Sequence, residues 1–148
     1  MTHPAHAHTA AALVLVPAEF ALERLSDAVF VGGWSLGSMR LQAVAPGVYR
    51  GVSMFDGSPA HVDIRPQVAL GLIDFGVGSA EQRVPRISVR VTPGAVLGHG
   101  AAECLVTLTA LRAAGASADL WARTCITHEA EILLIKAQLE TAFAGLAR

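Results

Sequence analysis

The sequence lacks the motifs of several common enzyme and metalloprotein classes. Its only two cysteines, Cys104 and Cys125, form no CxxC or zinc-ligand spacing, which argues against a disulfide framework and against a structural metal. No GxGxxG, HExxH or GxSxG pattern and no lysine-bearing phosphate loop occurs. We therefore expect no metal and no cofactor, and recognised catalytic machinery is absent.

An excess of charge of one sign is also missing. The 11 basic and 12 acidic residues give a net charge of -1, so electrostatics supplies no reason to propose nucleic acid or an anionic membrane as a partner. The longest early apolar run, residues 10–16, is too short to span a bilayer and is preceded by histidines rather than by Lys or Arg. We expect no membrane span, no signal peptide and a cytoplasmic location.

The N-terminal histidines precede the part of the chain that we expect to fold. Residues 1–8, which contain His3, His6 and His8, are expected to form a flexible N-terminus without a functional role. Residues 9–148 have the length of one domain.

Aromatic residues are scarce although the chain is apolar. They make up 5% of the sequence, against 53% hydrophobic residues and a mean hydropathy of +0.49. A bias toward Ala and Val, an internal cavity or an oligomer interface would each account for this composition. A homodimer is therefore one alternative.

The clearest pattern is a long amphipathic helix at the C-terminus. Ser117 is the expected N-cap, Asp119 lies in the first turn, and Gly145 is the expected left-handed ending. Residues at alternating steps of four and three form one apolar face that something must cover. These residues are Trp121, Cys125, His128, Ile132, Ile135, Leu139, Ala142 and Leu146.

The residues before this helix alternate in the manner of strands. A first strand over 10–16 precedes a helix whose expected first residue is Pro17. Later segments change to a period of two, with turns at Pro46–Gly47 and Asp56–Gly57. The expected later strands cover 39–43, 48–55, 61–65, 68–77, 86–92 and 102–111. An α+β fold with one antiparallel sheet of about seven strands follows from this order.

The same order resembles the START-like, or SRPBCC, superfamily, which includes polyketide cyclases, Bet v 1-like proteins and lipid-transfer domains. The resemblance is carried by a first strand ending in Pro17, Ala18 and Glu19, by Trp34 after a short second helix, and by the closing helix around 135–140. It implies a helix-grip fold, in which a curved sheet wraps the C-terminal helix, two short helices follow the first strand, and an apolar cavity lies between sheet and helix.

With few aromatic side chains to fill it, such a cavity has space for a small hydrophobic or aromatic ligand. Tyr49 and Phe55 are expected on one strand face, and Phe75 on a glycine-flanked strand. Which sheet face points inward cannot be read from the pattern, because a shift of one residue inverts it. The candidate ligand-binding residues are Trp34, Tyr49, Phe55, Phe75, Trp121, Cys125 and His128.

His128 is the candidate acid–base group. A neutral imidazole on a buried stripe can orient a ligand or move a proton. The alternative is a core histidine that a backbone carbonyl or a carboxylate satisfies. Asp63, Asp74 and Glu103 are all open as its partner.

Three other features have a structural and a functional interpretation. Trp121 is either a pocket wall or ordinary core, and Cys125 is either an activated or an inert buried thiol. The alternating residues His61, Asp63 and Arg65 form either an inward polar cluster or a solvated strand face, and the second is more common.

Two functions remain. The first is binding of a small hydrophobic or aromatic molecule, and the second is a polyketide cyclase or dehydratase activity in the same cavity with His128 as the acid–base group. A protein interaction module that exposes its apolar surface is a third.

Overall fold

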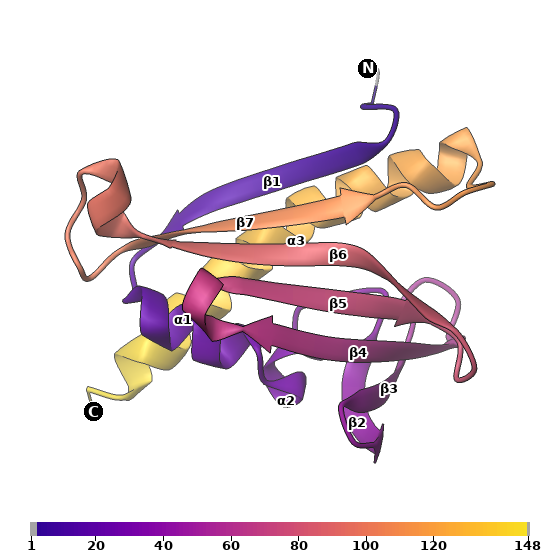
Figure 1. Ribbon diagram of the computed structural model, residues 1–148, viewed down its shortest axis with the longest axis horizontal. Coiled ribbons are helices and arrows are strands. Elements are labelled where there is room, and N and C mark those ends of the chain that lie inside the picture. Colours follow the sequence, from indigo (N-terminus) through magenta and orange to yellow (C-terminus); the bar gives the residue numbers. More distant parts are fainter. Residues whose placement is uncertain (1–2, 148) are drawn as a thin grey trace.

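The computed structural model describes residues 3–147 and contains one sheet and three α-helices (Figure 1). The strands are β1 (Ala7–Val14), β2 (Met39–Ala45), β3 (Val48–Val52), β4 (Pro59–Gln67), β5 (Leu72–Gly78), β6 (Arg83–Pro93) and β7 (Cys104–Leu111). The helices are α1 (Ala18–Leu25), α2 (Ala28–Val31) and α3 (Ala118–Gly145), with 3-10 turns η1 (Val68–Leu70) and η2 (Gly94–Leu97). This confirms the predicted α+β class.

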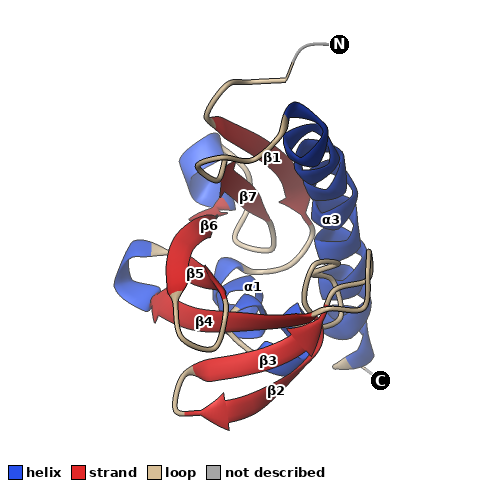
Figure 2. Cartoon of the chain, turned by 90° about the vertical axis from the view of Figure 1, so that its right-hand side faces the viewer, coloured by secondary structure: helices blue, strands red, loops and turns tan. Residues whose placement is uncertain are grey.

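All seven strands belong to one antiparallel sheet with the order β1-β7-β6-β5-β4-β3-β2. The sheet curves, and α3 lies along its open side (Figure 2). α3 packs mainly against β1 and β7, at one edge of the sheet. The buried face of α3 also joins the core formed by the middle strands, which is the arrangement of a helix-grip fold.

Successive side chains of a strand point to opposite faces of the sheet, and those on the inward face are mostly apolar. On β6 and β7 the residues Val89, Val91, Val106 and Leu108 are all buried, and they pack in one core with Ile135 of α3. Leu22 and Leu25 of α1 join this core. α1 and α2 thus close one end of the curved sheet.

The long helix begins where the sequence predicts. The Ser117 hydroxyl accepts a hydrogen bond from the Leu120 amide at 3.1 Å, and Asp119 lies in the first turn. The stripe from Trp121 to Leu139 is buried as expected, whereas Leu146 is exposed. The left-handed ending at Gly145 was wrong, because the helix ends with Leu146 in a right-handed conformation.

Two predicted strands are shorter than expected. β3 stops at Val52, and Phe55 lies in a turn in which Asp56 accepts a hydrogen bond from the Ser58 amide. The apolar segment 68–77 is not continuous, since residues 68–70 form η1 and Gly71 has φ 65°. In both cases local turn chemistry prevails over strand periodicity.

The first strand starts earlier than the sequence indicated. β1 includes Ala7 and His8, which the sequence analysis placed in the N-terminal segment 1–8. His8 pairs with Ala110 of β7, and the Arg112 amide donates to the His6 carbonyl. No helix among residues 3–147 is long and apolar enough to cross a membrane.

Candidate functional site

A pocket of about 260 Å³ lies between α3 and the inner face of the sheet. Its walls come from α3, from the loop that follows α2, from the β3–β4 turn and from strands β4, β5 and β6. The lining residues are Ser35, Gly37, Ser38, Phe55, Ala60, His61, Val62, Val77, Gly78, Ile87, Arg123, Thr124, Thr127, His128 and Glu131.

The helix wall of the pocket carries two buried ionisable groups. His128 and Glu131 are 3% and 4% exposed, and they lie one turn apart on α3. His128 Nε2 is 3.6 Å from Glu131 Oε1, which is longer than a hydrogen bond. The Leu36 amide, in the loop after α2, donates to Glu131 Oε2 at 2.9 Å and thereby fixes the carboxyl group.

Burial shifts the pKa values of these groups in opposite directions. Loss of solvation, helped by nearby His8, lowers the pKa of His128 to about 4. Loss of solvation raises the pKa of Glu131 to about 7, although the Leu36 amide favours the ionised carboxylate. At neutral pH His128 is therefore uncharged, and Glu131 exchanges between its neutral and ionised forms.

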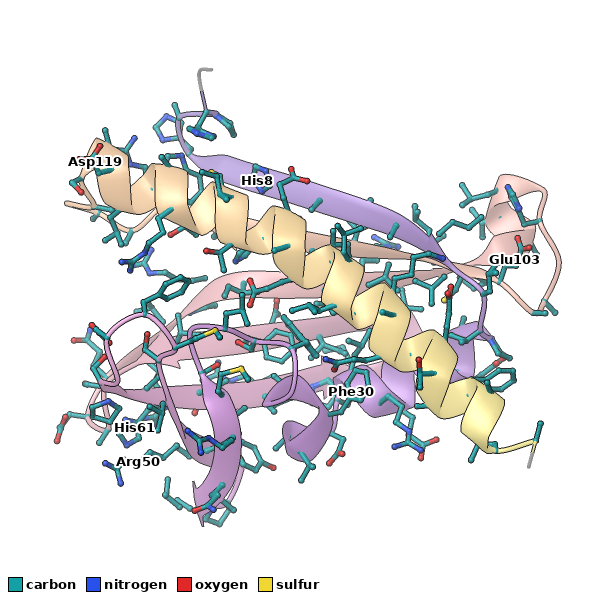
Figure 3. All side chains as sticks on the ribbon, turned by 180° about the vertical axis from the view of Figure 1, so that it is seen from behind. His8, Phe30, Arg50, His61, Glu103 and Asp119 are labelled. Atoms are coloured by element: carbon teal, nitrogen blue, oxygen red, sulfur yellow. The ribbon has the colours of Figure 1, made fainter. Side chains whose placement is uncertain are left out.

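His128 also has an unpaired nitrogen. Among residues 3–147, its buried Nδ1 has no hydrogen-bond partner, and the same is true of His8 Nδ1. The two rings lie edge to face with centroids 6.4 Å apart, and His8 Nε2 lies 2.9 Å from Glu129 Oε1. Figure 3 shows His8 on β1 beside α3, whereas His61 lies across the molecule on the side of β3 and β4.

The wall opposite the helix is apolar apart from His61 of β4. Val62 and Val77 come from the inner face of the sheet, and Ile87 lies beside them. At the edge of the pocket the guanidinium of Arg123 lies 4.5 Å from the centre of the Phe55 ring, and both side chains are exposed. The pocket thus has a polar helix side and an apolar sheet side.

Two of the seven predicted ligand-binding residues line this pocket, namely Phe55 and His128. Trp34 and Phe75 are buried and pack edge to face with centroids 6.3 Å apart. Tyr49 is half-buried on β3 and packs against the main core.

Trp121 and Cys125 lie away from the pocket. With Ala110 they form a separate buried cluster, and Trp121 Nε1 donates to the Pro4 carbonyl at 2.6 Å. Burial raises the pKa of the Cys125 thiol, so the geometry favours the inert interpretation. Cys104 is buried and free as well, and burial raises its pKa to about 11.

The sequence analysis missed Glu131. The carboxylates it considered as partners of His128 are engaged elsewhere: Asp63 binds Arg65 and Arg83, Glu103 lies 2.7 Å from His99, and Asp74 accepts from Gln67. The available signal was the spacing of three residues between His128 and Glu131, which places both on one side of a helix.

A second, larger hollow of about 710 Å³ lies beside α1, η1 and η2, and the core residues Leu22 and Val91 line part of it. Val68, Leu70 and Val96 line it and are exposed, and Glu19, Glu23 and Arg90 are its charged residues. It holds no buried ionisable group, so the inner pocket is the better candidate for a selective site. Among the described residues, no group of three or more His, Cys, Asp and Glu side chains is arranged to hold a metal ion.

No protein-family model matches the chain, and no curated protein does. Solved structures do match. A START superfamily protein from Mycobacterium smegmatis is 14% identical with a TM-score of 0.66, and the match covers 93% of this chain and 99% of that one. The Zhui aromatase/cyclase from a Streptomyces species is 16% identical with a TM-score of 0.60, over 90% and 93% of the two chains.

A third similar structure is the Aha1 dimer from Colwellia psychrerythraea. It is 11% identical with a TM-score of 0.65, and the match covers 90% of this chain and 96% of that chain. At these identities the likeness shows the fold alone.

Proposed function

Because this chain has the START-like fold, we propose that it binds a small hydrophobic or aromatic molecule in the pocket between α3 and the sheet. The observation that carries this proposal is the 260 Å³ pocket, with an apolar sheet side and the buried groups of His128 and Glu131 on its helix side. Apolar walls with a few placed polar groups are typical of small-molecule sites.

The size of the pocket favours a ligand of one or two rings. Ligand sites for drug-sized molecules usually enclose roughly 300 to 1,000 Å³, and this pocket lies just below that range. A long acyl chain would have to leave the pocket at its open side, where Phe55 and Arg123 are exposed.

Indole is a suitable probe, and NMR titration reports which residues respond to it. We expect shifts centred on Thr127 and Val77, and about tenfold weaker binding in Ala60→Phe, which places a ring in the pocket. Leu70→Phe changes the outer hollow and should leave binding intact. Loss of binding in Leu70→Phe alone, or no binding of indole at all, would contradict the proposal.

Catalysis of the cyclase or dehydratase type is the second candidate. The Zhui aromatase/cyclase shares the fold, and a buried carboxyl group whose pKa is about 7 is suited to proton transfer at neutral pH. Under this proposal Glu131 is a better acid–base group than His128, whose pKa of about 4 leaves it a weak base. Turnover that survives in Glu131→Gln but not in His128→Asn would reverse this assignment.

Homodimer formation is a further proposal. Ile126 and Leu133 lie two turns apart on α3, and each is 63% exposed. A protein of similar fold, Aha1 from Colwellia psychrerythraea, is a dimer.

The cytoplasmic location expected from the sequence also stays a proposal, which cell fractionation tests.

A further inference from the structure

We infer that the pocket selects a small organic cation: an aromatic or aliphatic amine whose ammonium group pairs with Glu131 while its apolar body lies against Val62, Val77 and Ile87. This inference rests on the proposed function and names the class of ligand. It uses Glu131, which the sequence analysis did not consider.

Glu131 has no cationic partner within the described part of the chain. The only ion-pair distance it makes there is the 3.6 Å contact with His128, and that imidazole is neutral at pH 7. A buried carboxylate without a counter-charge is unfavourable, and a ligand that supplies the missing positive charge removes this penalty. The Leu36 amide holds the carboxyl group in place before any ligand arrives.

No other charged or titratable group of the described pocket supplies the positive charge that would pair with Glu131. On α3, Arg123 is exposed with its guanidinium over the Phe55 ring, and it forms no ion pair with Glu131. His61, on β4, lies on the far side of the pocket, and strands β5 and β6 contribute no charged lining residue. His8 and Glu129 bind each other at the β1 side of α3.

The hydroxyl groups near Glu131 can take part in binding an ammonium group. The Ser35 and Ser38 hydroxyls lie 2.7 Å apart, and the Thr127 hydroxyl donates to the Arg123 carbonyl. Each keeps lone pairs that can accept a hydrogen bond from an ammonium group. A carboxylate ligand would meet the ionised form of Glu131 and be repelled.

Three indole compounds test this inference, because they share the ring and differ in charge. Tryptamine carries an ammonium group, tryptophol a hydroxyl group and indole-3-acetate a carboxylate. By calorimetry at pH 8, we expect tryptamine to bind about tenfold or more tightly than tryptophol, and indole-3-acetate to bind weakest.

Glu131→Gln keeps the shape of the side chain and an oxygen for the Leu36 amide. We expect it to abolish the preference for tryptamine while leaving tryptophol binding within about twofold. Glu129→Gln removes the same charge two residues away, outside the pocket, and should preserve the preference. Thermal unfolding confirms that each variant is folded.

A change in protonation gives a second readout. Near pH 7 Glu131 is partly protonated, so pairing with an ammonium group should release roughly half a proton, detected in buffers of different ionisation enthalpy. If tryptophol or indole-3-acetate binds as tightly as tryptamine or more tightly, the cation preference is overturned. If Ala60→Phe abolishes that binding, the pocket is still a ligand site. Failure of all three compounds to bind would overturn both proposals.

Discussion

The imidazole of His128 and the carboxyl group of Glu131 face each other across one turn of α3, with Nε2 3.6 Å from Oε1 and both side chains buried. They do not form an ion pair at neutral pH, because burial lowers the pKa of the first and raises that of the second. Each group therefore makes its own pH-dependent contribution to the stability of the fold.

The two shifts have opposite effects on stability. Glu131 ionises near 4.5 when unfolded and near 7 when folded, so its contribution to the free energy of unfolding falls as the pH rises between these values. His128 binds a proton near 6.5 when unfolded and near 4 when folded, so its contribution rises with pH between 4 and 6.5. The two slopes largely cancel in the wild type.

Glu131→Gln should expose the slope that His128 causes. We expect the free energy of unfolding of the variant to rise between about pH 4 and 6.5, and to exceed that of the wild type at pH 7.5 by on the order of 2 kcal/mol. Urea unfolding across this pH range measures both effects. A variant that is less stable than the wild type at pH 7.5 would show that the buried carboxyl group is stabilising.

Ile135→Ala should destabilise the fold strongly. Ile135 is fully buried between α3 and the sheet, so its truncation leaves a cavity and costs about 2 to 5 kcal/mol. Val29→Ala, at a residue of α2 that is 77% exposed, should change the free energy of unfolding by no more than about 0.5 kcal/mol. Similar losses in both variants, measured by denaturant unfolding, would contradict the docking of α3 by this face.

Gly71→Ala should be more harmful than Gly98→Ala. Both glycines have positive φ, 65° and 77°, so either substitution strains the backbone by about 1 kcal/mol. A Cβ at Gly71 would in addition lie 2.6 Å from the Val91 carbonyl oxygen, whereas one at Gly98 meets nothing within 4 Å. We expect Gly71→Ala to lower the free energy of unfolding by at least about 1 kcal/mol more than Gly98→Ala does, as measured by urea unfolding. Equal losses would mean that the backbone of β6 moves to relieve the contact at no measurable cost.

Leu133→Glu should dissociate a dimer formed through α3. A charge in the apolar contact cannot be buried at low cost, so sedimentation velocity should show a dimeric wild type and a monomeric variant. Val29→Glu, at a residue of α2 that is 77% exposed, is the matched control and should stay dimeric. A wild type that is monomeric at all concentrations contradicts the homodimer proposal.

Much of the fold was predictable from local patterns. The helical stripe from Trp121 to Leu139 and the alternation of Ile87, Val89 and Val91 are properties of short segments, and they indicate a helix with one buried face and a strand. Glycines at turns, such as Gly47 and Gly57, punctuate the strands because of their positive φ. The antiparallel sheet and the α+β class follow from these elements.

The site depended on contacts between distant segments. Glu131 became important only because α3 buries it and the loop after α2 brings the Leu36 amide to it. Trp121 and Cys125 share the stripe with His128, yet the packing of β1 and β7 places them in another cluster. The sequence by itself determined the order of strands and helices and the apolar stripe of α3, because these follow from periodicity. Only the tertiary structure decided which face of each strand is buried, which side chains enclose the pocket and how burial shifts their pKa values. Desolvation depends on neighbours far away in the chain.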